Sequence, residues 1–191
     1  MPLNRTYPVD IARRLPASEL AILDDGEAAR GEEDGLAGNQ QYQDLRGASW
    51  EEVSHVLAKE AALIERFEGA SDLDEEADRF EEERLEAVFP EDDLCGLDIG
   101  VAAATLAISA LGATPVSSCN AGGFGGHHVA RFPYVAFYLP RERAGEVLAI
   151  AEKAEVGLDI VDEGIARLCG RTDYDLHRFA KCALQVHVVE H

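Results

Sequence analysis

The sequence predicts an α+β protein in which an antiparallel or mixed sheet of about four strands is backed by helices and preceded by an acidic helical pair. Three observations lead to this prediction. In the second half of the chain, segments with helical apolar spacing alternate with segments rich in β-branched and aromatic residues. The connections between these segments are short. In the first half, two consecutive helical patterns carry carboxylates on nearly all their other faces.

The acidic helical pair is predicted over residues 49–69 and 71–90. Ser49 and Glu52 have the spacing of a capping box, and apolar residues then recur on one helical face until Gly69. The second pattern starts after Ser71 and stops at Pro90, which cannot continue a helix. Two helices joined by a short connection are expected to pack antiparallel.

The second half of the chain contains the predicted sheet. An alanine-rich helix comes first, and its small side chains predict close packing against a neighbour. Asp173 is the expected N-terminal cap of the last long helix. The predicted elements are a helix over 99–111, strands over 114–119 and 133–139, a helix over 141–154, strands over 157–161 and 165–169, a helix after 173, and a short terminal strand over 186–189.

Composition divides the chain into an irregular N-terminal segment (1–47), an acidic helical annex (48–96) and an α+β domain that carries the site (97–191). The first residues, around Tyr7, are expected to lie along the domain as an extended anchor, with a short helix over 16–23. Residues 24–43 show no apolar period and are rich in glycine and polar residues, which predicts a loop.

The net charge is −20, and 26 of the 37 acidic residues lie before residue 97. Such a surface repels phosphate backbones, so nucleic-acid binding is not expected. The charge has three explanations: a solvated surface, adaptation to high salt, or a surface that occupies a basic protein partner.

The longest apolar run, 101–116, is interrupted by polar residues and glycine and is too short to span a bilayer, so no membrane association is expected. The first residues contain no apolar stretch of the kind that secretory signals have, which predicts a cytoplasmic protein. Four widely spaced cysteines are then expected to be free thiols.

The candidate catalytic residues are Cys119, at the end of a predicted strand, and the pair His127 and His128 after a glycine-rich loop. A neighbouring imidazolium favours the thiolate, and a Cys-His pair suits nucleophilic attack on acyl or related electrophiles. The alternative is a half-buried cysteine beside two solvated histidines.

The loop between Cys119 and His127 is also a candidate binding site for a small anionic ligand. Glycines let backbone N–H groups line up on an anion, although the sequence fits neither the Walker loop nor the dinucleotide fingerprint. A flexible hairpin connection is the structural alternative. The predicted ligand-binding residues are Ser118, Asn120, Gly122, Gly123, Gly125, Gly126 and Arg131.

A zinc site is a third reading, because Cys119 and His127 are eight residues apart and so are Cys169 and His177. If the strands that end at the two cysteines were neighbours, these four side chains could surround zinc. The spacing within each pair is wider than structural zinc sites usually have.

These patterns give three hypotheses for the function. The leading one is a protein that binds a small anionic ligand at the loop 118–128, with Cys119 as a candidate nucleophile. The second is a non-enzymatic acidic protein that occupies a basic partner, as inhibitors and immunity proteins do. The third is a binding module stabilised by zinc.

Overall fold

The computed structural model describes residues 5–86, 94–125 and 130–188 of the 191-residue chain. Over these ranges it contains six α-helices and a four-stranded sheet, which confirms the predicted α+β class. The strand order is β1-β2-β4-β3, and all three pairings are antiparallel. Of the two predicted sheet types, the antiparallel one is therefore correct.

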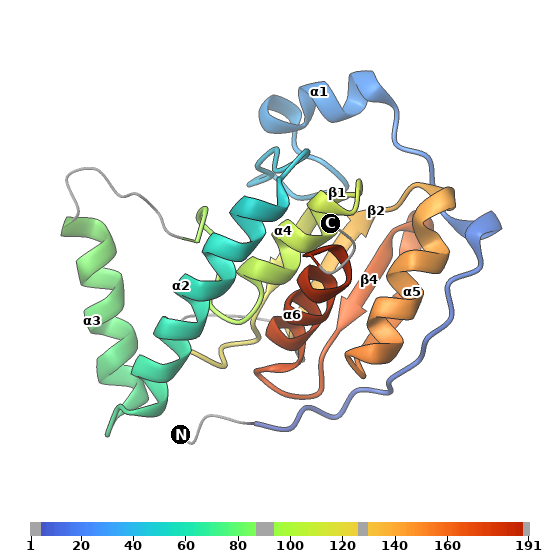
Figure 1. Cartoon of the computed structure of the whole chain (residues 1–191). Coiled ribbons are helices and arrows are strands. Elements are labelled where there is room, and N and C mark those ends of the chain that lie inside the picture. The colour runs from blue at the N-terminus through green and yellow to red at the C-terminus, as the bar shows by residue number, and fades with distance from the viewer. Residues whose placement is uncertain (1–4, 87–93, 126–129, 189–191) are drawn as a thin grey trace.

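The chain order of the elements matches the predicted order from the acidic helical pair onward (Figure 1). Strand β1 carries a bulge at Val116, where the pairing with β2 shifts. The elements are α1 (Asp25–Asp34), α2 (Trp50–Glu68), α3 (Leu73–Glu86), α4 (Ala102–Ala110), β1 (Thr114–Cys119), β2 (Tyr134–Tyr138), α5 (Ala144–Lys153), β3 (Gly157–Ile160), β4 (Ala166–Cys169) and α6 (Asp175–Val188).

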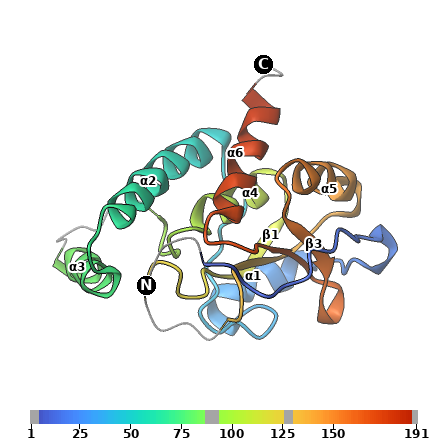
Figure 2. The ribbon, with the colours of Figure 1, turned by 90° about the horizontal axis from the view of Figure 1, so that it is seen from below.

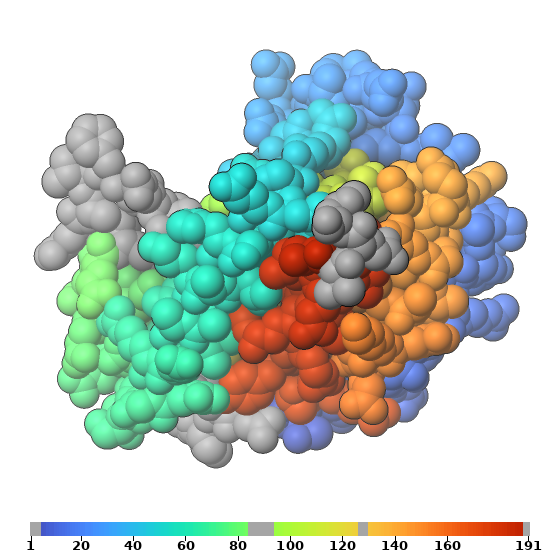
Figure 3. Space-filling model, viewed as in Figure 1, coloured from blue at the N-terminus to red at the C-terminus, as the bar shows by residue number. Residues whose placement is uncertain are grey.

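Helices α4, α5 and α6 cover one face of the sheet, and α2 lies against α4 and α6 (Figure 1). In the space-filling view, α2, α6 and α5 form a continuous surface over this face (Figure 3). Viewed from below, α1 lies on the opposite side of the sheet from these helices (Figure 2). The sheet therefore has a helix-covered face and a second face, called here the open face, which the segment around α1 partly covers.

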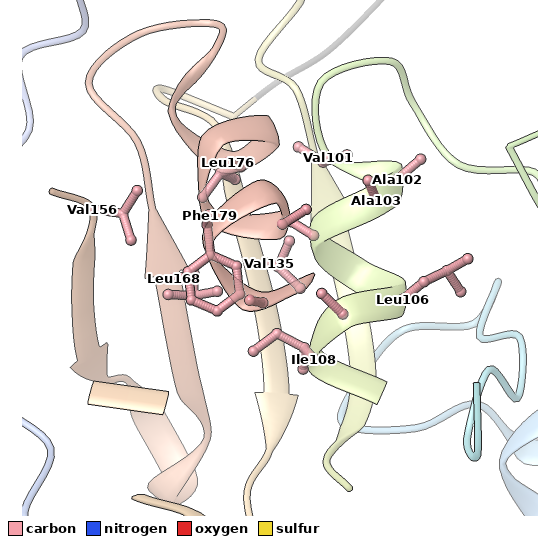
Figure 4. Packing of buried hydrophobic residues seen from close by; sticks show 14 of the residues in the cluster. Val101, Ala102, Ala103, Leu106, Ile108, Val135, Val156, Leu168, Leu176 and Phe179 are labelled. Atoms are coloured by element: carbon pink, nitrogen blue, oxygen red, sulfur yellow. The ribbon is translucent and has the colours of Figure 1, made fainter. Parts of the chain in front are cut away.

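The core lies between the sheet and helices α4 and α6 (Figure 4). Val135 of β2, Leu168 of β4 and Phe179 of α6 are fully buried there. Ala102, Ala103, Ala104 and Ala107 of α4 are also fully buried, because small side chains let this helix approach the sheet and α2 closely. The alanine-rich pattern therefore predicted its packing correctly.

The acidic helical pair forms as predicted. The capping box is present at the start of α2, with the Glu52 N–H donating to Ser49 Oγ at 3.2 Å. Helix α3 is tied to α2 by Arg66, whose guanidinium contacts Glu76 and binds both oxygens of Glu83 at 2.6 and 3.0 Å. The predicted end of this pair, at residues 87–90, lies outside the described residues.

Two predicted segments have a different secondary structure in the protein. Residues 25–34 form helix α1 rather than a loop, because Asp24 Oδ1 accepts the N–H groups of Gly26 and Glu27 at 2.9 and 3.2 Å. Residues 186–188 continue α6 rather than starting a strand. The stacking of His187 on Trp50, with ring centroids 4.1 Å apart, holds this last helical turn against α2.

The first described residues form the predicted extended anchor, which we call the N-terminal strap (5–14). It covers the outer edge of β3, where the Leu158 N–H donates to the Ala12 carbonyl at 2.7 Å and Arg14 donates back at 2.9 Å. Its Tyr7 hydroxyl donates to Asp173 at 2.6 Å. Asp173 therefore holds the strap, whereas the sequence suggested that it caps α6.

The predicted division into three segments at residues 47 and 96 stays a prediction. Within the described residues, α2, the helices behind the sheet and the sheet itself share one apolar core. None of the helices in this part of the chain combines the length and the apolar character that crossing a bilayer requires.

Candidate functional site

Cys119 ends strand β1 on the open face of the sheet. In the antiparallel register its partner is Tyr134, and Tyr134 in turn pairs with Cys169 of β4. Residues paired in this way share a face, so these three side chains form one row across the sheet. Ser117, Ala136, Arg167 and Asp159 form the next row.

The surroundings of Cys119 favour the protonated thiol. Burial raises the pKa of this thiol, and the nearby Asp98 carboxylate raises it further. The N–H groups of Ala121 and Ala130 point at the sulfur and lower the pKa only in part; the Ala121 nitrogen lies 3.4 Å from Sγ. These described neighbours make the thiol a weaker nucleophile at neutral pH than an ordinary cysteine.

The histidines predicted to activate this thiol, His127 and His128, lie outside the described residues, as does Gly126. The predicted Cys-His pair therefore stays a prediction.

The described part of the glycine loop is organised by Asn120, whose side chain is 4% exposed. Its Oδ1 accepts the N–H of Gly122 at 2.8 Å, and its Nδ2 donates to the Ile99 carbonyl at 3.1 Å. The N–H groups of Gly123 and Gly125 donate to carbonyls of the same loop. Because these amides already have acceptors within the chain, they are poor donors for the anion that the sequence suggested.

Close packing also explains why glycine stands at two positions of this loop. A Cβ on Gly123 would overlap the carboxylate of Asp173, and one on Gly125 would overlap Ala77 of α3. Between them, Phe124 is buried and meets Phe67 and Tyr174 edge-on, with centroid distances of 5.9 and 6.4 Å. The described part of the loop is thus packed against α2 and α3.

The side chains predicted to bind zinc do not converge in the part of the chain that the structure describes. Strand β2 lies between β1 and β4, so Cys119 and Cys169 are two strands apart, about 10 Å. His177 lies on the other side of the sheet, where its Nδ1 is 2.6 Å from Glu60 Oε2. Among the described residues, no three histidine, cysteine or acidic side chains are placed to hold a metal ion.

The arginines near the predicted site differ in their partners. Arg167 binds Asp159 through two hydrogen bonds of 3.1 and 2.7 Å, and its guanidinium lies over the Phe132 ring, 5.3 Å from the centroid. Arg131 is exposed and forms no ion pair with another described residue. Arg131 is therefore the predicted ligand-binding residue whose charge is available.

Arg131 lines a cleft of about 540 Å³ on the open face, called here the face cleft. Aromatic and aliphatic side chains form much of its lining, and Ser117 adds a hydroxyl group. Asp162 and Glu163 line it as well, and so does Arg167, whose charge is paired with Asp159. The apolar part of the lining comprises Ala37, Val116, Ala130, Phe132, Tyr134, Ala136, Val161 and Ile165.

A second cleft, of about 420 Å³, runs along β1 and is called here the edge cleft. It adjoins the face cleft, because both are lined by Val116, Ser117 and Tyr134. Besides Tyr134, three segments distant in sequence line it: 39–45, 96–105 and 115–118. Ser118, predicted as a ligand-binding residue, lines this cleft, whereas Cys119 lines neither.

The amides Asn39, Gln41 and Gln43, which line the edge cleft, were missed because they lie in a segment without apolar period. The buried Glu60 was also missed, although the sequence contained a signal for it.

Glu60 falls on the same helical face as Val53, Leu57 and Ile64, where a carboxylate is unexpected unless it has a partner.

The fold and the two clefts define an α+β protein with an antiparallel sheet whose open face and one edge are accessible. Comparison with protein-family models, with curated proteins and with solved structures finds no match.

Proposed function

We propose that the protein binds a small amphiphilic molecule with a single anionic group in the face cleft. Arg131 carries this proposal: its guanidinium lies at the cleft without an ion pair to another described residue, in a chain with 37 acids and only 17 lysines and arginines. A planar guanidinium with five donors binds a carboxylate or phosphate through paired hydrogen bonds.

The rest of the lining narrows the ligand class. The rings of Phe132 and Tyr134 suit an aromatic or aliphatic body, and the Ser117 hydroxyl offers one further hydrogen bond. Asp162 and Glu163 repel a second negative charge. A monoanion with an apolar body therefore fits better than a polyanion.

This proposal keeps the anionic ligand that the sequence suggested and moves its anchor from the loop amides to Arg131. It includes no covalent step. The described surroundings of Cys119 favour its protonated form, and the activating role of His127 and His128 is still a prediction.

The test uses benzoate, neutral benzamide and dianionic phthalate in an NMR titration of the full chain. Benzoate is expected to shift the amide signals of Ser117 and Tyr134 most strongly. Because Arg131→Gln removes the charged hydrogen bonds between the guanidinium and the carboxylate, it is expected to weaken benzoate binding about tenfold or more. Arg14→Gln, at an exposed arginine on the N-terminal strap, is the matched control and leaves binding unchanged. Equal binding of benzamide and benzoate, or equal benzoate binding by Arg131→Gln, would overturn the proposal.

A further inference from the structure

Strand β1 forms one edge of the sheet, and the edge cleft runs along its residues 115–118. We infer that this edge binds an extended basic peptide, which joins the sheet as a fifth strand beside β1. Adding a peptide strand to a sheet edge is a recurrent mode of recognition, in which main-chain hydrogen bonds provide the affinity.

The protein treats its two sheet edges differently. At β3 the N-terminal strap supplies main-chain hydrogen bonds to Leu158 and so occupies that edge. At β1, within the described part of the chain, the contact recorded for a main-chain group outside the sheet comes from a side chain instead: Asn39 Nδ2 donates to the Val116 carbonyl at 2.8 Å. An edge strand presents main-chain donors and acceptors to any added strand unless its own chain covers them.

The Asn39 contact also shows how a peptide would bind. The Val116 carbonyl points away from β2, and a side-chain amide takes the place that a partner strand's N–H group would have. In an antiparallel ladder, every second residue of an edge strand directs its main-chain groups outward. Pro115 has no N–H, so we place the pairing on residues 116–119.

The lining of the edge cleft suits peptide main chain. Asn39 and Thr105 already form hydrogen bonds within the chain. The side chains of Gln41, Gln43, Ser117 and Ser118 can donate and accept hydrogen bonds, as the successive groups of an extended peptide require. The polar side chains are Asn39, Gln41, Gln43, Asp98, Thr105, Ser117 and Ser118.

Charge selects a basic peptide. Among the described residues that line the edge cleft, Asp98 is charged and neither lysine nor arginine is present. The chain as a whole carries a net charge of −20, which attracts a basic segment and repels a second copy of this protein.

The test measures fluorescence anisotropy of a labelled, end-blocked hexapeptide of alternating lysine and valine, added to the full-length protein at physiological salt. Two control peptides separate the contributions. One replaces each lysine with glutamate, and the other keeps the lysines but carries N-methyl groups on alternate backbone nitrogens. We expect saturable binding of the parent peptide and at least tenfold weaker binding of both controls.

Two variants locate the binding. Gln41→Lys puts a positive charge into the edge cleft, whereas Gln40→Lys puts the same charge next to it on an exposed residue outside the lining. Only Gln41→Lys is expected to weaken binding of the parent peptide. Of the consecutive amides of Ser117 and Ser118, the one that points away from β2 is expected to gain protection from hydrogen exchange on binding. Equal affinity for the N-methylated peptide would mean charge attraction without strand pairing. A dimer that the peptide does not dissociate would mean that a second copy holds the edge. Either result, like the absence of binding, would overturn the inference.

Discussion

The carboxylate of Glu60 in α2 lies 2.6 Å from the imidazole Nδ1 of His177 in α6, and both residues are buried, at 0% and 5% exposure. The other carboxylate oxygen accepts the N–H groups of Gly100 and Ala102 at 3.0 and 2.9 Å. These amides lie at the start of α4, where a negative charge is favoured. One side chain of α2 thus contacts two of the helices that pack on the sheet, α4 and α6.

Replacing Glu60 by alanine is expected to lower the free energy of unfolding by about 3–5 kcal/mol, because it leaves a buried imidazole and helix amides without an acceptor. Urea denaturation followed by circular dichroism measures this loss. Glu65→Ala, at an exposed carboxylate of the same helix, is the control and is expected to change stability by less than about 0.5 kcal/mol. Equal midpoints for the two variants would contradict the bridging role of Glu60.

Gly123→Ala is expected to destabilise the protein by about 1–3 kcal/mol, because the new methyl group would overlap the Asp173 carboxylate that also holds Tyr7. Gly145, in the exposed part of α5, has open space around it, and Gly145→Ala is expected to stabilise the protein by about 0.5–1 kcal/mol. Thermal unfolding of both variants tests whether the glycine loop is packed. A loop that tolerated both substitutions alike would be a loose connection instead.

The raised pKa of Cys119 predicts slow alkylation at neutral pH, since the thiolate is the reactive form. The rate with iodoacetamide is expected to keep rising above the pH at which an exposed cysteine reaches its plateau. Peptide mass spectrometry reports the rate for this site among the four cysteines. Asp98→Asn removes a carboxylate that raises the pKa, so it is expected to move the profile to lower pH; an unchanged profile would rule out that electrostatic influence.

Tyr42 predicts a stability change at high pH. Burial and the nearby Asp44 carboxylate raise the pKa of its hydroxyl from 10.0 to about 12, so the folded state favours the neutral form. The stabilisation is fully present below the ordinary value and is lost as the pH rises from 10.0 to about 12. The free energy of unfolding should therefore fall less over this window in Tyr42→Phe than in the wild type. Parallel curves for the two proteins would contradict the shift.

The predictions from sequence succeeded where a local period is strong. The apolar stripe of α2, the β-branched and aromatic run of β2 and the alanines of α4 each report a buried face directly. They failed where the stabilising partner is distant. Helix α1 has almost no apolar stripe, and it is held by the packing of Tyr42 against Gly31. The last turn of α6 depends on Trp50, in a different helix.

The sequence by itself determined the fold class, the order of the elements from the acidic helical pair to α6, and the position of Cys119 at the end of β1, because side-chain period and capping are local properties. Only the tertiary structure decided what surrounds that place. It separated Cys119 from Cys169 by a strand, placed His177 with Glu60 on the helix side, and formed two clefts from segments far apart in the chain. The physical reason is that strand order and helix packing depend on how the whole core is buried. No single segment of the sequence contains that information.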